Sequence, residues 1–182
     1  RRRTLAGDGE PWRNLRQFVR KPLFVPGTIP VEKAFEMMRT TRGHMALDDF
    51  PKALAAYKVL AMDYGPQSTW ATQQPDPETV TEAQSRIEAV IREQAMTLHE
   101  LGQRDDRKEY FERAAEMYRV YRSEFDDSKD SYKLTFYLGE ILFHRLGQNA
   151  EAGDAYVAAA RKNPKGELTK DALYNALGAF ER

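Results

Sequence analysis

The feature that most constrains this chain is a helical hairpin that the sequence spells once in full and begins to spell again on either side. Between Asp127 and Pro164, small and apolar residues recur at helical steps, and Gly147 separates two helices. The first helix carries Leu134, Leu138, Gly139 and Leu142, and the second carries Ala152, Tyr156 and Ala159. Self-similarity with a period of about 34 residues is typical of stacked two-helix units that cannot bury their apolar faces alone. Such a repeat indicates a protein that binds other molecules rather than one that carries out chemistry.

The pattern predicts an all-α solenoid of about three hairpins and a terminal helix, preceded by an irregular arm. We expect the arm over residues 1–30, where glycine and proline are too dense for a long helix. A helical repeat domain is expected over residues 31–182. Its hairpins are predicted at about 31–65, 79–126 and 129–164, with a final helix at 169–182.

Capping and helix-breaking residues predict where the second helix of the first hairpin begins and ends and where the next loop lies. Asp48 and Asp49 offer an N-cap, and Gly65 with the proline after it should end the helix. Residues 66–78 read as a loop that contains one large apolar side chain, Trp70. Because an exposed tryptophan is costly, we expect Trp70 to pack against a neighbouring hairpin; a ligand-facing position is the alternative.

The second hairpin is predicted to begin with a helix that starts after Pro77 and runs to Leu101, where Gly102 closes it, followed by a long turn at 103–108. Its partner helix carries a stripe of aromatic and small residues at steps of three and four, which we interpret as packing between hairpins. The stripe consists of Phe111, Ala114, Tyr118, Tyr121 and Phe125. The apolar face predicted for the final helix consists of Ala172, Leu173, Ala176, Leu177 and Phe180.

Charge and composition exclude several classes of protein. The formal net charge is zero, with 28 basic and 28 acidic residues, which argues against a sequence-independent nucleic-acid binder. The absence of cysteine excludes disulfides and thiolate chemistry, and no apolar run is long enough for a membrane-spanning helix. Basic side chains gather in residues 1–21, where no signal peptide is expected. We expect a linker there; a module that binds anionic lipid or peptidoglycan is the alternative.

Neither a metal site nor a catalytic site is predicted. His44, His99 and His144 each fall late in a predicted first helix, but their registers differ by about one residue, and neighbouring first helices in stacked hairpins lie about 8 to 10 Å apart. We expect them to be solvated or helix-end residues, and we expect no cofactor. Neither a Gly-rich phosphate loop nor a nucleophile elbow occurs, and the carboxylate pairs lie in predicted turns as helix caps.

The pattern resembles the tetratricopeptide repeat, whose first helix has a small residue midway and whose second helix has a small residue, an aromatic, an alanine and a closing proline. The third hairpin supplies Gly139, Ala152, Tyr156, Ala159 and Pro164. The first hairpin matches at Ala53, Tyr57 and Pro66, and the second at Ala95, Ala114 and Tyr118. The resemblance implies a superhelix in which the first helices line a concave groove.

A narrower resemblance links residues 31–182 to the large tetratricopeptide proteins of the myxobacterial cell envelope, some of which are associated with gliding motility. It depends on the phrases around Trp70, from Tyr118 to Ser128, from Tyr132 to Phe143, and from Asn163 to Ala176. It implies a periplasmic or outer-membrane-associated location; a cytoplasmic location is the alternative.

The repeat resemblance also implies which side chains face the groove. They are Arg92, Met96, His99 and Glu100 in the second hairpin, Lys133, Phe136, Glu140, Phe143 and His144 in the third, and Ala172 and Asn175 in the final helix. This mixture of charge, amide and aromatic groups suits a peptide or a helix of another protein. The basic clamp that some relatives of this repeat class use for a C-terminal carboxylate is incomplete, so a chaperone tail is not the expected ligand.

The sequence therefore predicts a non-enzymatic scaffold for a protein or peptide partner, within a bacterial envelope or motility complex. No nucleic-acid partner is expected. Peripheral contact of the basic arm with a membrane or cell wall is the alternative mode of action, and the oligomeric state is left open.

Overall fold

The computed structural model describes residues 49–182, and in this part of the chain it is all-helical, with no strand. The elements are α2 (Phe50–Tyr64), α3 (Thr69–Gln73), α4 (Pro77–Asp105), α5 (Lys108–Glu124), α6 (Ser131–Ile141), the π-helical turn η2 (Leu142–Leu146), α7 (Asn149–Lys162) and α8 (Thr169–Phe180). The all-α prediction is confirmed for these residues. The predicted arm, the first helix of the first hairpin and His44 lie outside the described residues.

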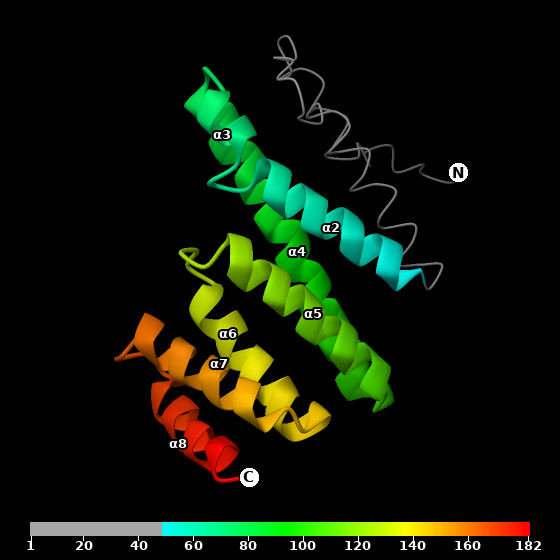
Figure 1. The fold of residues 1–182 in the computed structure, drawn as a ribbon, viewed down its shortest axis with the longest axis vertical. Coiled ribbons are helices and arrows are strands. Elements are labelled where there is room, and N and C mark those ends of the chain that lie inside the picture. Colours follow the sequence, from blue (N-terminus) through cyan, green and yellow to red (C-terminus); the bar gives the residue numbers. More distant parts are fainter. Residues whose placement is uncertain (1–48) are drawn as a thin grey trace, which may run out of the picture.

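The helices follow one another along the long axis of the molecule, from α2 and α3 at one end to α8 at the other (Figure 1). The pairs α4–α5 and α6–α7 are joined by short turns, and α5 packs on α6 as α7 packs on α8. At the other end α2 packs on both α4 and α5. Each pair thus buries its apolar face against the next one, which is the arrangement that a helical repeat requires.

The core is a continuous seam through the second helix of each pair. Tyr57 in α2, Tyr118 in α5 and Tyr156 in α7 are fully buried, together with the alanine four residues before each of them. The stripe predicted for α5 is buried as well, from Phe111 to Phe125. Large aromatic side chains dominate the burial of apolar area in such a seam, so they are its main source of stability.

Trp70 lies in the core, as predicted. Its side chain is 2% exposed, and its ring centroid is 5.1 Å from that of Tyr64 at the end of α2. The residues around it differ from the predicted loop, because Thr69–Gln73 form the short helix α3. Ser68 caps this helix by accepting a hydrogen bond from the Ala71 N–H at 3.1 Å, so the local capping signal outweighs the loop-like composition.

The predicted end of the first helix of the second hairpin is wrong. Gly102 lies inside α4, which continues to Asp105, and a Cβ at Gly102 would come within 2.9 Å of the Phe111 ring. The glycine allows α4 and α5 to approach each other instead of capping a helix. The turn is therefore much shorter than predicted and consists of Asp106, in the left-handed conformation, and Arg107.

In the third hairpin Gly147 separates the helices as predicted, with φ at +67°. The approach to it was not predicted, because α6 passes into the π-helical turn η2 before the break. A π turn widens the helix locally and re-aims the side chains that follow, and such turns are frequent at functional sites. Here it sets the directions of Phe143 and His144.

The final helix buries only part of the apolar face that was predicted for it. Ala172, Ala176 and Ala179 face α7 and are buried, whereas Leu173, Leu177 and Phe180 are each more than half exposed. Alanine allows close packing of α8 on α7, which leaves the larger apolar side chains on the outer side. No helix in residues 49–182 is long and apolar enough to cross a membrane.

Candidate functional site

The candidate site is the first-helix face, which we define as the side of the stack to which α4, α6 with η2, and α8 contribute polar and aromatic side chains. The residues predicted for it and found at least partly accessible are Arg92, Met96, His99, Glu100, Lys133, Glu140, Phe143, His144 and Asn175. Side-chain contacts join neighbouring first helices at two places, one around Glu140 and one around His99. The sequence alone predicts only that these polar groups share one face of the stack. The two contacts also fix their positions relative to one another.

Glu140 is the centre of the first contact. Its Oε1 accepts a hydrogen bond from the Tyr156 hydroxyl at 2.7 Å and another from the Asn175 amide at 2.9 Å. His144, one turn further along, has its Nε2 at 3.9 Å from the same oxygen. Burial, and then the hydrogen bond to Glu140, raise the pKa of Tyr156 above its ordinary value. Hydrogen bonds to a carboxylate are the strong ones, so this group fixes α6, α7 and α8 relative to one another.

His99 is the centre of the second contact. Its Nδ1 lies 3.1 Å from the Tyr118 hydroxyl and its Nε2 lies 3.2 Å from the Gln103 amide. Its ring also meets the edge of Tyr137 in α6, with centroids 6.1 Å apart. Burial lowers the pKa of His99, although nearby Glu140 partly opposes this effect. At neutral pH the His99 imidazole is therefore neutral. It packs between α4 and α6, and only part of its surface is accessible to a partner.

Two basic side chains, Arg92 and Lys133, continue this face through ion pairs. Arg92 Nε lies 3.2 Å from Glu88 and 3.4 Å from Asp130, which links α4 to the residue before α6. Lys133 Nζ lies 2.9 Å from Glu167 in the turn between α7 and α8. The Lys133–Glu167 pair is largely exposed, so its contribution to stability is small and its charges are available to a partner.

Phe136 and Ala172 are placed differently from the expectation. Phe136 is 7% exposed and its ring centroid is 5.6 Å from that of Tyr156, so it belongs to the core and offers no anchor in a groove. The reason is Gly139, where a Cβ would come within 2.8 Å of the Tyr156 ring. The ring lies close to α6 there, and Phe136 packs on it from the preceding turn. Met96 is partly buried against the core, and Ala172 is buried between α8 and α7.

Phe143 and His144 lie together on the π turn, with ring centroids 4.8 Å apart. The guanidinium of Arg182 lies 5.0 Å from the Phe143 ring, and the Phe143 centroid is 6.4 Å from that of Tyr156. His144 is half exposed, at 51% of its side chain. This pair gives the first-helix face a partly accessible aromatic contact.

Two residues of this face were missed by sequence reasoning. Tyr137 touches both His99 and Phe136, and Gln103 is a hydrogen-bond partner of His99. A step of four from Lys133 would have found Tyr137. Gln103 was assigned to a turn because Gly102 was interpreted as a helix end. Within residues 49–182, no group of three or more His, Asp or Glu side chains could hold a metal ion.

Comparison of the chain with protein-family models, with curated proteins and with solved structures found no match. Function is therefore inferred from the side chains themselves.

Proposed function

We propose that this chain is a tetratricopeptide-like solenoid and a non-enzymatic scaffold, and that it binds a peptide or protein segment across the first-helix face. The repeat assignment is supported by three buried pairs at the same step. Ala53 with Tyr57, Ala114 with Tyr118, and Ala152 with Tyr156 are all fully buried on successive second helices. Three copies of one packing unit are what a stacked helical repeat needs for a continuous core.

The observation that carries the binding proposal is the hydrogen bonding of Glu140 to both Tyr156 and Asn175. It orders the polar groups of α6 and α8 before any ligand arrives. An ordered receptor loses little conformational freedom on binding, which preserves affinity. Around this fixed centre, the exposed Lys133 and His144 supply the polar rim and Phe143 supplies an apolar contact. A short extended or helical peptide is the ligand that suits such a strip.

The polar groups of this face are engaged in helix-to-helix contacts, which favours recognition over catalysis. The balanced charge of the chain favours a protein partner over nucleic acid. By its resemblance to myxobacterial envelope proteins, we propose that the scaffold works in a periplasmic or outer-membrane-associated assembly.

The proposal is tested by selecting binders from a displayed library of random peptides of about twelve residues. Selected peptides are measured against the wild type, against Lys133→Ala/His144→Ala, and against Lys52→Ala/Lys108→Ala, whose exposed lysines lie on α2 and α5. Loss of a rim contact and a charge should weaken binding about tenfold or more in the first double variant. The second should bind as the wild type does.

Two results contradict the proposal. One is a library that yields no peptide dependent on Lys133 and His144. The other is a set of peptides that all lose binding in the control variant, which would place recognition on another face. Circular dichroism of each variant establishes that helicity is unchanged before binding is compared.

A further inference from the structure

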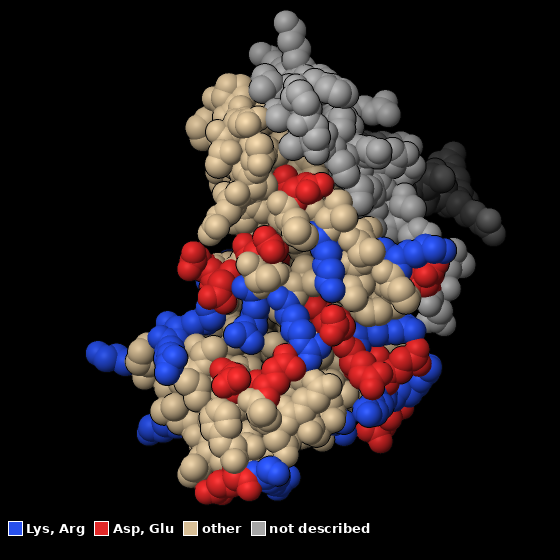
Figure 2. Space-filling model, viewed as in Figure 1, with Lys and Arg blue, Asp and Glu red and all other residues tan. Residues whose placement is uncertain are grey.

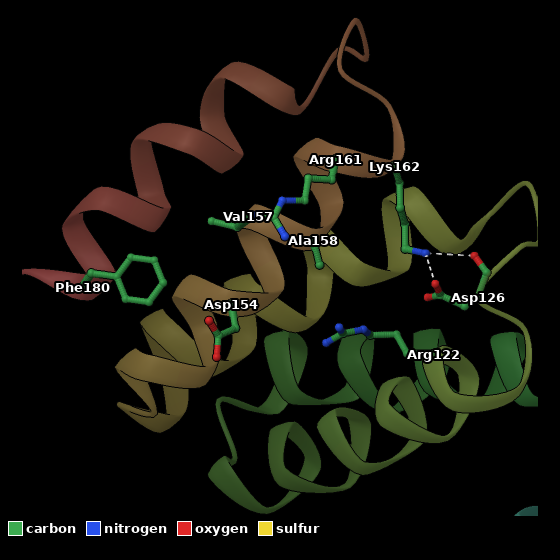
Figure 3. A pocket seen from close by; sticks show the side chains of 8 residues that line it. All are labelled: Arg122, Asp126, Asp154, Val157, Ala158, Arg161, Lys162 and Phe180. Atoms are coloured by element: carbon green, nitrogen blue, oxygen red, sulfur yellow. Dashed lines mark hydrogen bonds and ion pairs between the residues drawn. The ribbon is translucent and has the colours of Figure 1, made fainter.

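A hollow of about 740 Å³ lies between α5, α7 and the end of α8 (Figure 3). Arg122 of α5 extends into it from one side, and Asp154 and Arg161 of α7 line the other. Phe180 points toward it from the end of α8. None of the residues that line it belongs to α4 or α6. The hollow is therefore separate from the first-helix face.

Two of the cations at this hollow form no hydrogen bond and no close ion pair in the part of the chain that the structure describes, although the charge of Arg122 helps to lower the pKa of Glu151. Lys162 is satisfied, because its Nζ lies 2.5 Å from the Asp126 carboxylate and also donates to the Asp126 carbonyl at 2.9 Å. Arg122 and Arg161 form no ion pair or hydrogen bond with residues 49–182, and the Nε of Arg122 is buried without an acceptor. Elsewhere on the same helices, Arg119 is paired with Glu151 at 2.7 Å.

A buried guanidinium N–H without an acceptor is costly, and native structures pair such groups. The planar fork of arginine matches an oxyanion, which it binds through two parallel N–H groups. The surrounding face mixes both signs of charge, with basic and acidic side chains interspersed over α5 and α7 (Figure 2). The Arg122 guanidinium inside the hollow therefore needs one hydrogen-bond acceptor, and it is not part of a broad basic surface.

The remaining lining selects the kind of anion. Asp154 and Asp126 also border the hollow, and their carboxylates repel a compact ion of high charge. Val157, Ala158 and the Phe180 ring give it an apolar side, and Phe180 is 55% exposed. The ring can lie against α7 because Gly153 has no side chain; a Cβ there would come within 2.5 Å of it. An anionic group with an apolar neighbour fits both parts of this lining.

We propose that the hollow binds a peptide segment in which a carboxylate side chain stands next to a large apolar residue. The carboxylate lies between the guanidinium groups of Arg122 and Arg161, the apolar side chain lies on Val157 and Phe180, and Asp154 accepts a backbone N–H of the peptide. The volume accommodates a few side chains, within the range of about 300–1,000 Å³ that is usual for ligand sites. This second site would let the scaffold hold an acidic segment independently of its first-helix face.

The test uses the ¹⁵N-labelled chain and the Nε–Hε signal of Arg122, which is identified by its loss in Arg122→Gln. The probe is acetyl-Asp-Leu-Glu-Phe-amide. Its controls are the neutral analogue acetyl-Asn-Leu-Gln-Phe-amide, the analogue acetyl-Asp-Gly-Glu-Gly-amide without apolar side chains, and inorganic phosphate. We expect the probe to shift the Arg122 signal and to bind about tenfold more tightly than either analogue, because each analogue lacks one half of the interaction.

Matched variants localise the effect. Arg122→Gln/Arg161→Gln should weaken binding about tenfold or more, whereas Lys165→Gln/Lys170→Gln, which removes as much charge from exposed positions outside the hollow, should change it less than about twofold. The proposal is overturned if no peptide moves the wild-type Arg122 signal, a result that needs no variant to fold. It is also overturned if phosphate moves the signal as strongly as the probe does, since the site would then be a plain anion site. Neither result bears on Lys133 or His144, so the proposed function is tested separately.

Discussion

The pairs α4–α5 and α6–α7 bury a tyrosine at the same step of their second helix and give its hydroxyl different partners. Tyr156 donates to the carboxylate of Glu140 in α6, whereas Tyr118 lies against the imidazole of His99 in α4. The aromatic ring does the same packing in both pairs, and both tyrosines are fully buried. The comparison teaches that the two pairs share a buried tyrosine ring at the same position, whereas the hydrogen-bond partner of its hydroxyl differs between them. The first-helix face can therefore change its polar character from pair to pair without loss of the seam.

The largest expected effect comes from removal of the rings. Tyr118→Ala and Tyr156→Ala should each lower the free energy of unfolding by about 3–5 kcal/mol, because a large aromatic side chain is lost from a closely packed core. Urea unfolding followed by circular dichroism measures both values. A loss below about 1 kcal/mol in either variant would contradict the assignment of that ring to the seam.

The second prediction separates the two hydroxyl groups. Tyr156→Phe should cost about 1.5–3 kcal/mol, since its partner is a carboxylate, and Tyr118→Phe about 0.5–1.5 kcal/mol, since its partner is a neutral imidazole. The same urea titrations provide the comparison. Equal costs would mean that the charge of Glu140 is not felt at Tyr156. Glu140→Gln is the matching control: it should abolish the difference by bringing the cost of Tyr156→Phe close to that of Tyr118→Phe.

The third prediction concerns the close approach of α6 and α7. Gly139→Ala should destabilise the protein by about 1 kcal/mol net, because overpacking against the buried Tyr156 ring costs more than the gain of about 1 kcal/mol in helix propensity. Gly178→Ala is the control, since the nearest atom to its Cβ is 3.8 Å away on Phe143. That variant should be neutral or more stable than the wild type. The order of the two thermal midpoints checks the prediction, and a reversed order refutes it.

The smallest effect is a change in pH dependence that belongs to the α4–α5 pair. The pKa of His99 in the folded chain is lowered below its ordinary value of 6.5. At a pH between these two values, the unfolded chain binds a proton at His99 that the folded chain does not. The corresponding stability is complete above about pH 6.5 and decreases as the pH falls through the folded pKa. Urea midpoints of the wild type between about pH 7.5 and pH 5.5 should fall more steeply than those of His99→Gln. Parallel curves would show that His99 does not contribute.

The sequence pattern predicts the second helices well, because a buried aromatic at a regular step leaves a strong periodic signal. Tyr118, Tyr156 and the breaks at Gly65 and Gly147 all lie where the pattern placed them. Gly102 was misread because one residue type serves both as a helix end and as a point of close helix approach. The choice between them depends on the Phe111 ring opposite, and that is a tertiary contact.

The sites were harder to predict than the helices. The repeat resemblance placed Phe136 on the same side as Glu140, yet the two differ in depth, because Phe136 packs against the Tyr156 ring whereas Glu140 accepts a hydrogen bond from the Tyr156 hydroxyl. No feature of the sequence indicates that Arg122 lacks an ion-pair partner. Whether a surface arginine forms an ion pair depends on residues from other helices. Arg119 and Arg122 cannot be distinguished by sequence, and only Arg119 forms an ion pair with Glu151.

In residues 49–182, the pairs α4–α5 and α6–α7 and the helix α8 contact chiefly their neighbours along the chain, and α2 packs on the α4–α5 pair. This part of the chain is therefore a linear stack of helices. A load applied at its two ends would pass through every junction in turn and open the weakest one first. Such a stack is expected to lengthen in steps and to close again as the load is released.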